Sequence, residues 1–196
     1  MSRKPRSVAP GLPHLVIHRS APHTVLFRID RERKFYLQLI AECCQKERMD
    51  LLGYCLLPTE TRLILVPPSA NSLSRALGRA HYNYSLCTSM NRNPPGPVFQ
   101  SRFQSSTLHP DDWWQSLLDL ELAPVHNGLA QLPDQYRWSS AAAHAGSAEP
   151  PPWLALHPWN TIHSPRSWRC LLGPTALELG NQLVAPSARC PALPTR

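Results

Sequence analysis

The sequence contains no apolar run of roughly 18 residues, the length that a transmembrane helix needs. Its opening, MSRKPRSVAPG, is basic but lacks the apolar core of a secretory signal. The six cysteines are scattered and include no C-x-x-C pair, which favours reduced thiols over a disulfide framework or a zinc site. The G-x-x-x-x-G-K-[ST] loop, the G-x-S-x-G elbow and the H-E-x-x-H helix are also missing. We therefore expect a cytoplasmic protein without the chemistries that these motifs carry.

Glycine is scarce, at 8 residues against 22 prolines, and the prolines gather in loops and toward the C-terminus. The chain has 196 residues, of which 42% are hydrophobic, so it can build the core of one domain plus an extension. A Pro-Pro-Pro run follows Glu149 and marks a boundary. We expect a basic tail over 1–9, a domain over 10–148, and a weakly packed, partly helical, proline-rich extension over 149–196.

The charge balance is basic, with a net charge of +7 and a pI near 9.4. Near the start of the chain, Asp30 and Glu32 stand against a larger basic set of Arg3, Lys4, Arg6, Arg19, Arg28, Arg31, Arg33 and Lys34. A basic cluster at one end is typical of proteins with a polyanion partner, and nucleic acid is the first candidate. A solvated basic face that only aids solubility is the alternative, and charge alone does not choose between the two.

Hydrophobic periodicity predicts strands and helices in the order of an α+β domain. Helices are expected over 30–48, 71–90 and 110–122, the last one ended by Ala123-Pro124, and strands over 14–19, 49–58, 61–66 and 98–107. A short helix should begin within 136–140, and helical segments are expected near 168–172 and 176–184. This order favours helices packed on one face of an antiparallel sheet, whose open face is a common platform for nucleic acid.

Five short stretches resemble, in the correct order, motifs of the REP-associated tyrosine transposases, which belong to the HUH, insertion-sequence-200-like superfamily. They are PGLPHLVIHR over 10–19, GYCLLP over 53–58, GPVFQSRF over 96–103, APVHNGL over 123–129 and PDQYRWSS over 133–140. The family writes the second as A-Y-C-L-M-P, and the last reproduces P-x-x-Y-x-W-S-S in full. The resemblance covers residues 10–146 and implies the ferredoxin-like, RRM-like fold of the HUH transposases. An unrelated α+β domain is the alternative.

Members of this family cut single-stranded DNA with a tyrosine hydroxyl and recognise imperfect palindromic hairpins of REP elements. The resemblance implies a divalent metal, such as Mg²⁺ or Mn²⁺, held by a His-x-His pair on one strand and by the Asn of a Y-x-x-x-N motif on a helix. In this sequence Glu60 and Arg62 stand at the histidine positions, Asp119 at the nucleophile and Ala123 at the Asn. All four are replaced, so the resemblance implies a bacterial pseudoenzyme without a metal cofactor, associated with the nucleoid when it is bound to DNA.

A guanidinium cannot act as a metal ligand, so Arg62 is itself a cation at the place where the family holds one. Glu60 and Asp119 could still form the Mg²⁺ site of a repurposed DNA nuclease. An ion pair with Arg62 would, however, satisfy these carboxylates without metal. We expect Tyr82, Tyr84 and Tyr136 to pack against the core. We expect His14, His18 and His23 to be scattered over the surface.

Binding remains, because phosphate contacts from basic residues supply much of the affinity for DNA. The candidate residues are Arg3, Lys4, Arg6, Arg19, Arg75, Arg79, Arg92 and Arg102. Trp113 and Trp114 could stack on bases, although at least one of them should belong to the core. The sequence favours a protein, more readily a monomer than an oligomer, that binds hairpin or single-stranded DNA of REP-like palindromes without cutting it. A vestigial or protein-interaction module without DNA binding is the alternative, favoured by the replacements at Ser20-Ala21 and His126-Asn127.

Overall fold

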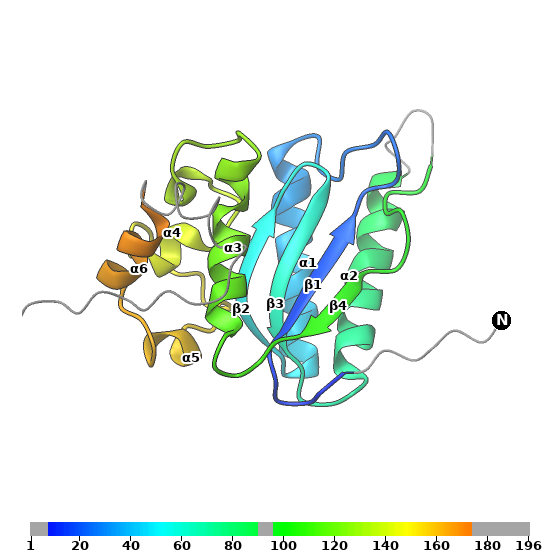
Figure 1. The fold of residues 1–196 in the computed structure, drawn as a ribbon. Coiled ribbons are helices and arrows are strands. Elements are labelled where there is room, and N and C mark those ends of the chain that lie inside the picture. The colour runs from blue at the N-terminus through cyan, green and yellow to red at the C-terminus, as the bar shows by residue number, and fades with distance from the viewer. Residues whose placement is uncertain (1–7, 90–95, 174–196) are drawn as a thin grey trace, which may run out of the picture.

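The computed structural model describes residues 8–89 and 96–173, and Figure 1 shows their arrangement. The main body consists of β1 (His14–Arg19), α1 (Asp30–Glu47), β2 (Asp50–Leu56), β3 (Glu60–Val66), α2 (Ser72–Ser89) and β4 (Gln104–Thr107). The later elements are α3 (Trp113–His126), the 3₁₀ turn η1 (Pro133–Gln135), α4 (Ala141–His144), α5 (His157–Asn160) and α6 (Pro165–Leu172). Within these two ranges, no helix is long and apolar enough to span a bilayer.

The strands form one sheet in the order β2-β3-β1-β4, and every neighbouring pair is antiparallel. In Figure 1, α1 and α2 lie side by side behind this sheet, while α3 lies along β2. The predicted α+β class and antiparallel sheet are confirmed. The helices predicted over 30–48 and 71–90 and the first three predicted strands agree with the structure to within a residue or two at each end.

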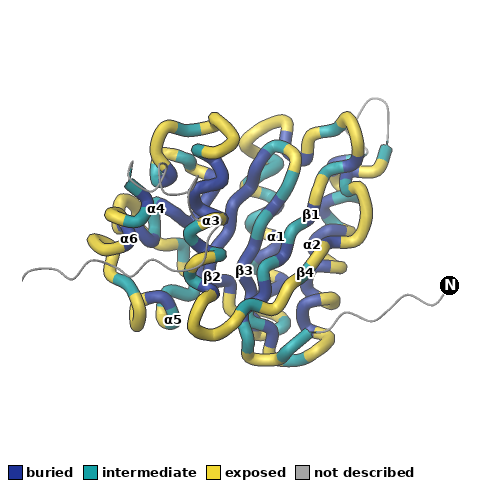
Figure 2. The backbone as a smooth tube through the Cα atoms, in the orientation of Figure 1, coloured by how far each residue is buried: buried dark blue, intermediate teal, exposed yellow. Residues whose placement is uncertain are grey.

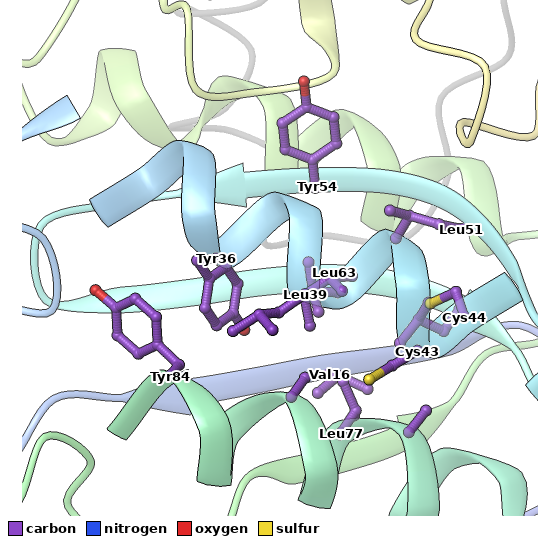
Figure 3. Packing of buried hydrophobic residues seen from close by; sticks show 14 of the residues in the cluster. Val16, Tyr36, Leu39, Cys43, Cys44, Leu51, Tyr54, Leu63, Leu77 and Tyr84 are labelled. Carbon is purple, nitrogen blue, oxygen red and sulfur yellow. The ribbon is translucent and has the colours of Figure 1, made fainter. Parts of the chain in front are cut away.

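The main core lies between the sheet and the α1–α2 pair, as the close view in Figure 3 shows. Alternation along β3 turns Leu63 and Leu65 toward the helices, where Leu39 of α1 belongs to the same buried cluster. Tyr84 of α2 is fully buried in this layer, and its hydroxyl donates a hydrogen bond to the carbonyl of Leu26 at 2.7 Å. The prediction that Tyr84 packs is therefore confirmed.

Two predictions about single side chains on this side of the sheet are wrong. His14 and His18 are buried rather than scattered over the surface, because they lie on the same helix-facing side of β1 as Val16. His23 is exposed, as expected. Tyr82 does not pack: its side chain is 67% exposed, because it lies on the side of α2 that faces away from the core.

The outer edge of β2 is covered by a later segment of the chain. The Tyr136 hydroxyl donates to the carbonyl of Leu56 at 2.8 Å, and the Leu56 N–H donates to the carbonyl of Trp138 at 2.9 Å. The backbone of Tyr54 pairs twice with Ser140, donating to its Oγ at 3.1 Å and accepting from its N–H at 2.9 Å. The P-x-x-Y-x-W-S-S motif therefore acts as a strand-like cover that protects an exposed sheet edge.

A second core lies on the opposite face of the sheet, between β2 and α3. Cys55 and Ile64 point to this side, and Leu117 of α3 packs against them. The helix comes so close that a Cβ atom at Gly53 would lie 2.3 Å from Leu117 Cδ1. The prediction of helices on one face of the sheet therefore holds for α1 and α2. α3 lies on the other face, over β2, because β2 carries apolar side chains on both of its faces.

The chain that follows α3 is anchored by Glu121, whose side chain is fully buried. Ser140 Oγ donates to Glu121 Oε1 at 2.6 Å, and His144 Nδ1 lies 2.6 Å from the same oxygen. Trp168 Nε1 donates to Oε2 at 2.8 Å. His144 Nε2 is buried without a partner in the described structure, so the tautomer that carries its proton on Nδ1 and donates to Glu121 fits this site.

The expectation of a weakly packed extension is wrong for residues 149–173. Trp159 and Trp168 are among the largest fully buried side chains, and their rings meet edge to face with centroids 5.8 Å apart. The Ala155 N–H donates to the carbonyl of Leu51 on β2 at 2.9 Å. Bulky apolar side chains between the prolines supply the burial that proline content obscures. The helix expected near 176–184 lies outside the described residues, and the predicted domain limits stay predictions.

The strand predicted over 98–107 is shorter in the structure, where only its last four residues form a strand, β4. Before it, a single isolated bridge joins Phe99 to Ser20 at the end of β1. Residues 100–103 are bends and coil rather than strand, although the Ser101 carbonyl lies 2.7 Å from His18 Nε2 of β1. Apolar content alone therefore overestimated this strand.

Three helix boundaries also differ from the prediction. α3 begins at Trp113, three residues after the predicted start at Pro110, and it continues through Pro124 to His126 instead of ending before the proline. Proline removes one backbone donor, and the surrounding burial of α3 offsets that loss. The short helix expected within 136–140 begins only at Ala141, because the residues before it pair with the edge of β2.

We expect Glu121→Ala to lower the free energy of unfolding by roughly 3–5 kcal/mol, because it leaves the buried donors of Ser140, His144 and Trp168 without their acceptor. Chemical denaturation followed by tryptophan fluorescence measures this decrease. Glu149→Ala removes an exposed carboxylate and should change the same quantity by less than about 0.5 kcal/mol. A Glu121→Ala variant as stable as the wild type would show that these contacts do not hold the C-terminal segments in place.

Candidate functional site

A row of polar side chains crosses the sheet face opposite α1 and α2. Strand register places Arg19 of β1 directly opposite Glu60 of β3, and Ile17 between Arg62 of β3 and Gln104 of β4. Alternate residues of a strand share one face, so these side chains stand on the side away from the main core. Figure 2 shows β4 largely exposed next to the buried central strands. We refer to Arg19, Glu60, Arg62 and Gln104 as the open-face cluster.

Two guanidiniums converge on the carboxylate of Glu60, whose side chain is only 12% exposed. Arg62 donates from Nε to Glu60 Oε1 at 2.6 Å, and its Nη2 lies 2.6 Å from the same oxygen. Arg19 Nε lies 3.2 Å from Glu60 Oε2, and its Nη1 donates to Gln104 Oε1 at 3.2 Å. Glu60 is therefore a shared acceptor that holds two arginine side chains in defined positions on the sheet.

Asp119 approaches this cluster from α3. Its side chain is exposed at the surface, yet neighbouring protein atoms partly desolvate the carboxyl and raise its pKa. Electrostatic interactions with His126 and Arg62 oppose this rise in the pKa of Asp119, so both groups lie close enough to act on its carboxyl. The formal charges of Arg19 and Arg62 are balanced by those of Glu60 and Asp119, so acidic groups interrupt the positive surface here.

The residues at these positions do not fit a divalent metal ion. Ala123 is buried on α3 and offers no donor atom, and the guanidinium of Arg62 cannot ligate a cation. Glu60 already receives two guanidiniums. Across residues 8–89 and 96–173, no three His, Cys, Asp or Glu side chains converge to hold a metal. The cluster can instead bind an anion, because arginine forks can exchange a carboxylate for a phosphate group of similar geometry.

The structure separates the basic residues that the sequence grouped as candidate DNA ligands. Arg19 belongs to the open-face cluster, and Arg102 is exposed in the loop before β4. Arg75 and Arg79 lie on α2, behind the sheet in Figure 1. Four others lie outside the described residues: Arg3, Lys4, Arg6 and Arg92. A single small DNA-contacting surface therefore cannot include all of the candidate residues, because Arg19 and Arg75 lie on opposite sides of the sheet.

Some contacts at this face gave no signal in the sequence. Gln104 joins the cluster only through the pairing of β4 with β1, a register that the sequence does not show.

Trp113 is buried, which confirms that at least one tryptophan of the Trp113–Trp114 pair belongs to the core. Trp114 is half-buried and meets the His163 ring at a centroid distance of 5.2 Å, so it packs against the C-terminal segment.

Comparison with known proteins identifies the fold. No family model matches the chain, and no curated protein does. The chain is similar to the solved structure of a REP-associated tyrosine transposase bound to a REP hairpin, with a TM-score of 0.62 and 13% sequence identity over 79% of this chain and 92% of that one. A Deinococcus radiodurans protein assigned as a transposase gives a TM-score of 0.42 and 16% identity over 61% and 96% of the two chains, too weak a likeness for any conclusion. The resemblance inferred from the five motifs is thus confirmed at the level of the fold.

We expect Arg62→Ala to raise the pKa of Asp119 further, because removal of a neighbouring positive charge disfavours the carboxylate form. An NMR titration of the Asp119 carboxyl carbon measures this shift. Lys34→Ala removes an equal charge from an exposed position on α1, on the other side of the sheet, and should leave the pKa of Asp119 unchanged. If the pKa stayed constant or fell in Arg62→Ala, Arg62 would not be a close neighbour of Asp119.

Proposed function

We propose that this protein binds hairpin or single-stranded DNA of REP-like palindromes through the open face of its sheet and does not cut it. The observation that carries the proposal is the open-face cluster, where two guanidiniums share one carboxylate on the fold of a REP-associated tyrosine transposase. The solved structure with that fold is bound to a REP hairpin, so a folded single strand is the first ligand to test. The proposal places a monomer on DNA in a bacterial cytoplasm.

The arginines of the cluster are suited to the DNA backbone. The side chain of Arg19 is 49% exposed and that of Arg62 is 29% exposed, so a ligand can reach both. A guanidinium presents parallel N–H donors that match two oxygens of a phosphate. Such contacts hold a strand in register without reading its bases, and they make the affinity strongly dependent on salt.

Strand cleavage finds no support in the residues that occupy the catalytic positions of the resembling family. Asp119 replaces the tyrosine nucleophile, and Ala123 replaces an amide ligand. A repurposed nuclease would need Glu60 and Asp119 to share one metal ion. Arg62 forms an ion pair with Glu60, and its positive charge opposes the rise in the pKa of Asp119 that burial causes. These contacts favour an ion-paired arrangement over a metal site.

One observation favours a second candidate, a vestigial or protein-interaction module that no longer binds DNA. Glu60 and Asp119 place two negative charges beside Arg19 and Arg62, and these repel phosphate. Hairpin affinity of the wild-type protein therefore decides between the two candidates.

A mobility-shift assay with a labelled palindromic hairpin, run across a salt series with and without Mn²⁺, separates the candidates. We expect a salt-sensitive shift of intact DNA in both conditions. Cleavage in Mn²⁺ would establish a nuclease built on Glu60 and Asp119. A hairpin that fails to shift even at low salt would leave the protein-interaction module.

We expect Glu60→Gln to strengthen hairpin binding roughly tenfold, because it removes the carboxylate that competes with a DNA phosphate for Arg19 and Arg62. Arg62→Ala should weaken binding. Glu149→Gln makes the same change of charge at an exposed position away from the sheet and should have little effect. Equal affinities of Glu60→Gln and the wild type would show that DNA does not use the open face.

A further inference from the structure

A small groove lies between the end of α1 and the start of α2, in the helical layer behind the sheet. The two helices run antiparallel, so the last turn of α1 meets the first turns of α2. The groove has a volume of about 150 Å³ and is lined by Cys43, Lys46, Glu47, Arg75, Ala76 and Arg79. We call it the α1–α2 groove. The methyl side chain of Ala76 leaves room between the longer charged side chains.

The charge of the groove is strongly positive for its size. Glu47 accepts hydrogen bonds from Arg75 Nε at 2.9 Å and Nη2 at 2.6 Å, so its carboxylate is committed to that residue. Lys46 and Arg79 have no ion-pair partner in the part of the chain that the structure describes. Desolvation by burial raises the pKa of the Cys43 thiol, which therefore adds no negative charge. Three cations thus face one carboxylate, whereas the charges around the open-face cluster cancel.

The same surface of α2 carries an exposed aromatic ring. Tyr82 is 67% exposed and Leu86 is 50% exposed, although most large apolar side chains of α2 are buried. Residues three apart lie on one side of a helix, so Tyr82 follows Arg79 about 4.5 Å further along the axis. The exposed face of α2 therefore offers an uncommitted cation and, next to it, an accessible flat ring.

We propose that the α1–α2 groove and Tyr82 form a second nucleic-acid site, which binds one single-stranded segment with a backbone phosphate between Lys46 and Arg79 and the adjoining base stacked on Tyr82. A basic groove beside an aromatic ring is the combination that sequence-tolerant single-strand binding requires. A duplex fits less well, because its bases are already stacked on one another. The site does not depend on the open-face cluster, which lies on the opposite side of the sheet.

The test uses fluorescence anisotropy with a short, unstructured, labelled oligothymidine and the full chain. Lys46→Ala/Arg79→Ala should weaken binding roughly tenfold and reduce the slope of log affinity against log salt by about 0.7, because one phosphate is no longer neutralised. The matched control Lys34→Ala/Arg166→Ala removes the same two charges from exposed positions outside the groove and should bind more tightly than the groove variant. Equal weakening in the two double variants would overturn the proposal.

Substitutions at Tyr82 test the stacking interaction separately. Tyr82→Ala should weaken binding roughly tenfold and leave the salt slope unchanged, whereas Tyr82→Phe should keep the affinity because the ring remains. Oligothymidine that does not bind the wild type, or binds Tyr82→Ala equally well, would overturn the proposal. All substituted side chains are exposed or at the groove, and circular dichroism checks that each variant is folded.

An Arg19→Ala/Arg62→Ala variant distinguishes this site from the proposed function. It should lose hairpin affinity and retain oligothymidine binding through the groove. If the groove variants behave like the control while Arg19→Ala/Arg62→Ala loses the hairpin, the second site is absent and the proposed function stands. If Arg19→Ala/Arg62→Ala keeps hairpin affinity while the groove variants lose it, the open face is not the hairpin site.

Discussion

A carboxylate that is removed from water is costly unless its oxygens accept hydrogen bonds, and Glu121 accepts from three partners. These partners belong to segments that come later in the chain, so the polypeptide after α3 must return to the second core. Ser140 also joins the backbone of Tyr54 in β2. One buried side chain therefore connects the edge of the sheet, α3 and α6, and residues 149–173 belong to the packed structure despite their many prolines.

The sequence predicted the local elements better than their partners. Alternation in 14–19 and 61–66 and the helical spacing in 30–48 and 71–90 are local patterns, and they predicted the corresponding elements. The same alternation, applied to His14 and His18, would have placed both in the core beside Val16. The contacts of Glu60 with Arg19 and of Glu121 with Trp168 depend on register and chain topology, which no local pattern contains. The W-S-S motif marked the fold from sequence, but its physical role became clear only from its hydrogen bonds to β2.

The distribution of charge over the surface is a second property that local sequence patterns do not show. The net charge of +7 predicts affinity for polyanions in general, but it does not say where on the surface that affinity resides. Acidic residues balance the arginines of the open face, while the helical layer concentrates cations in a groove that no sequence motif marks. Lys46 and Arg79 are distant in sequence and become neighbours only because α1 and α2 pack antiparallel.

Gly53 has a wider effect than its lack of a side chain suggests. The resembling family writes alanine at this place in A-Y-C-L-M-P, whereas here Leu117 occupies the space that a Cβ atom would need. Leu117 is fully buried, so a methyl group at position 53 would have to displace it within a filled core or lift α3 from the sheet. α3 also carries Asp119, where the charge of Arg62 opposes the rise in pKa that burial causes. A residue without charge or side chain thus permits the close approach of the helix that brings this carboxyl to the open face.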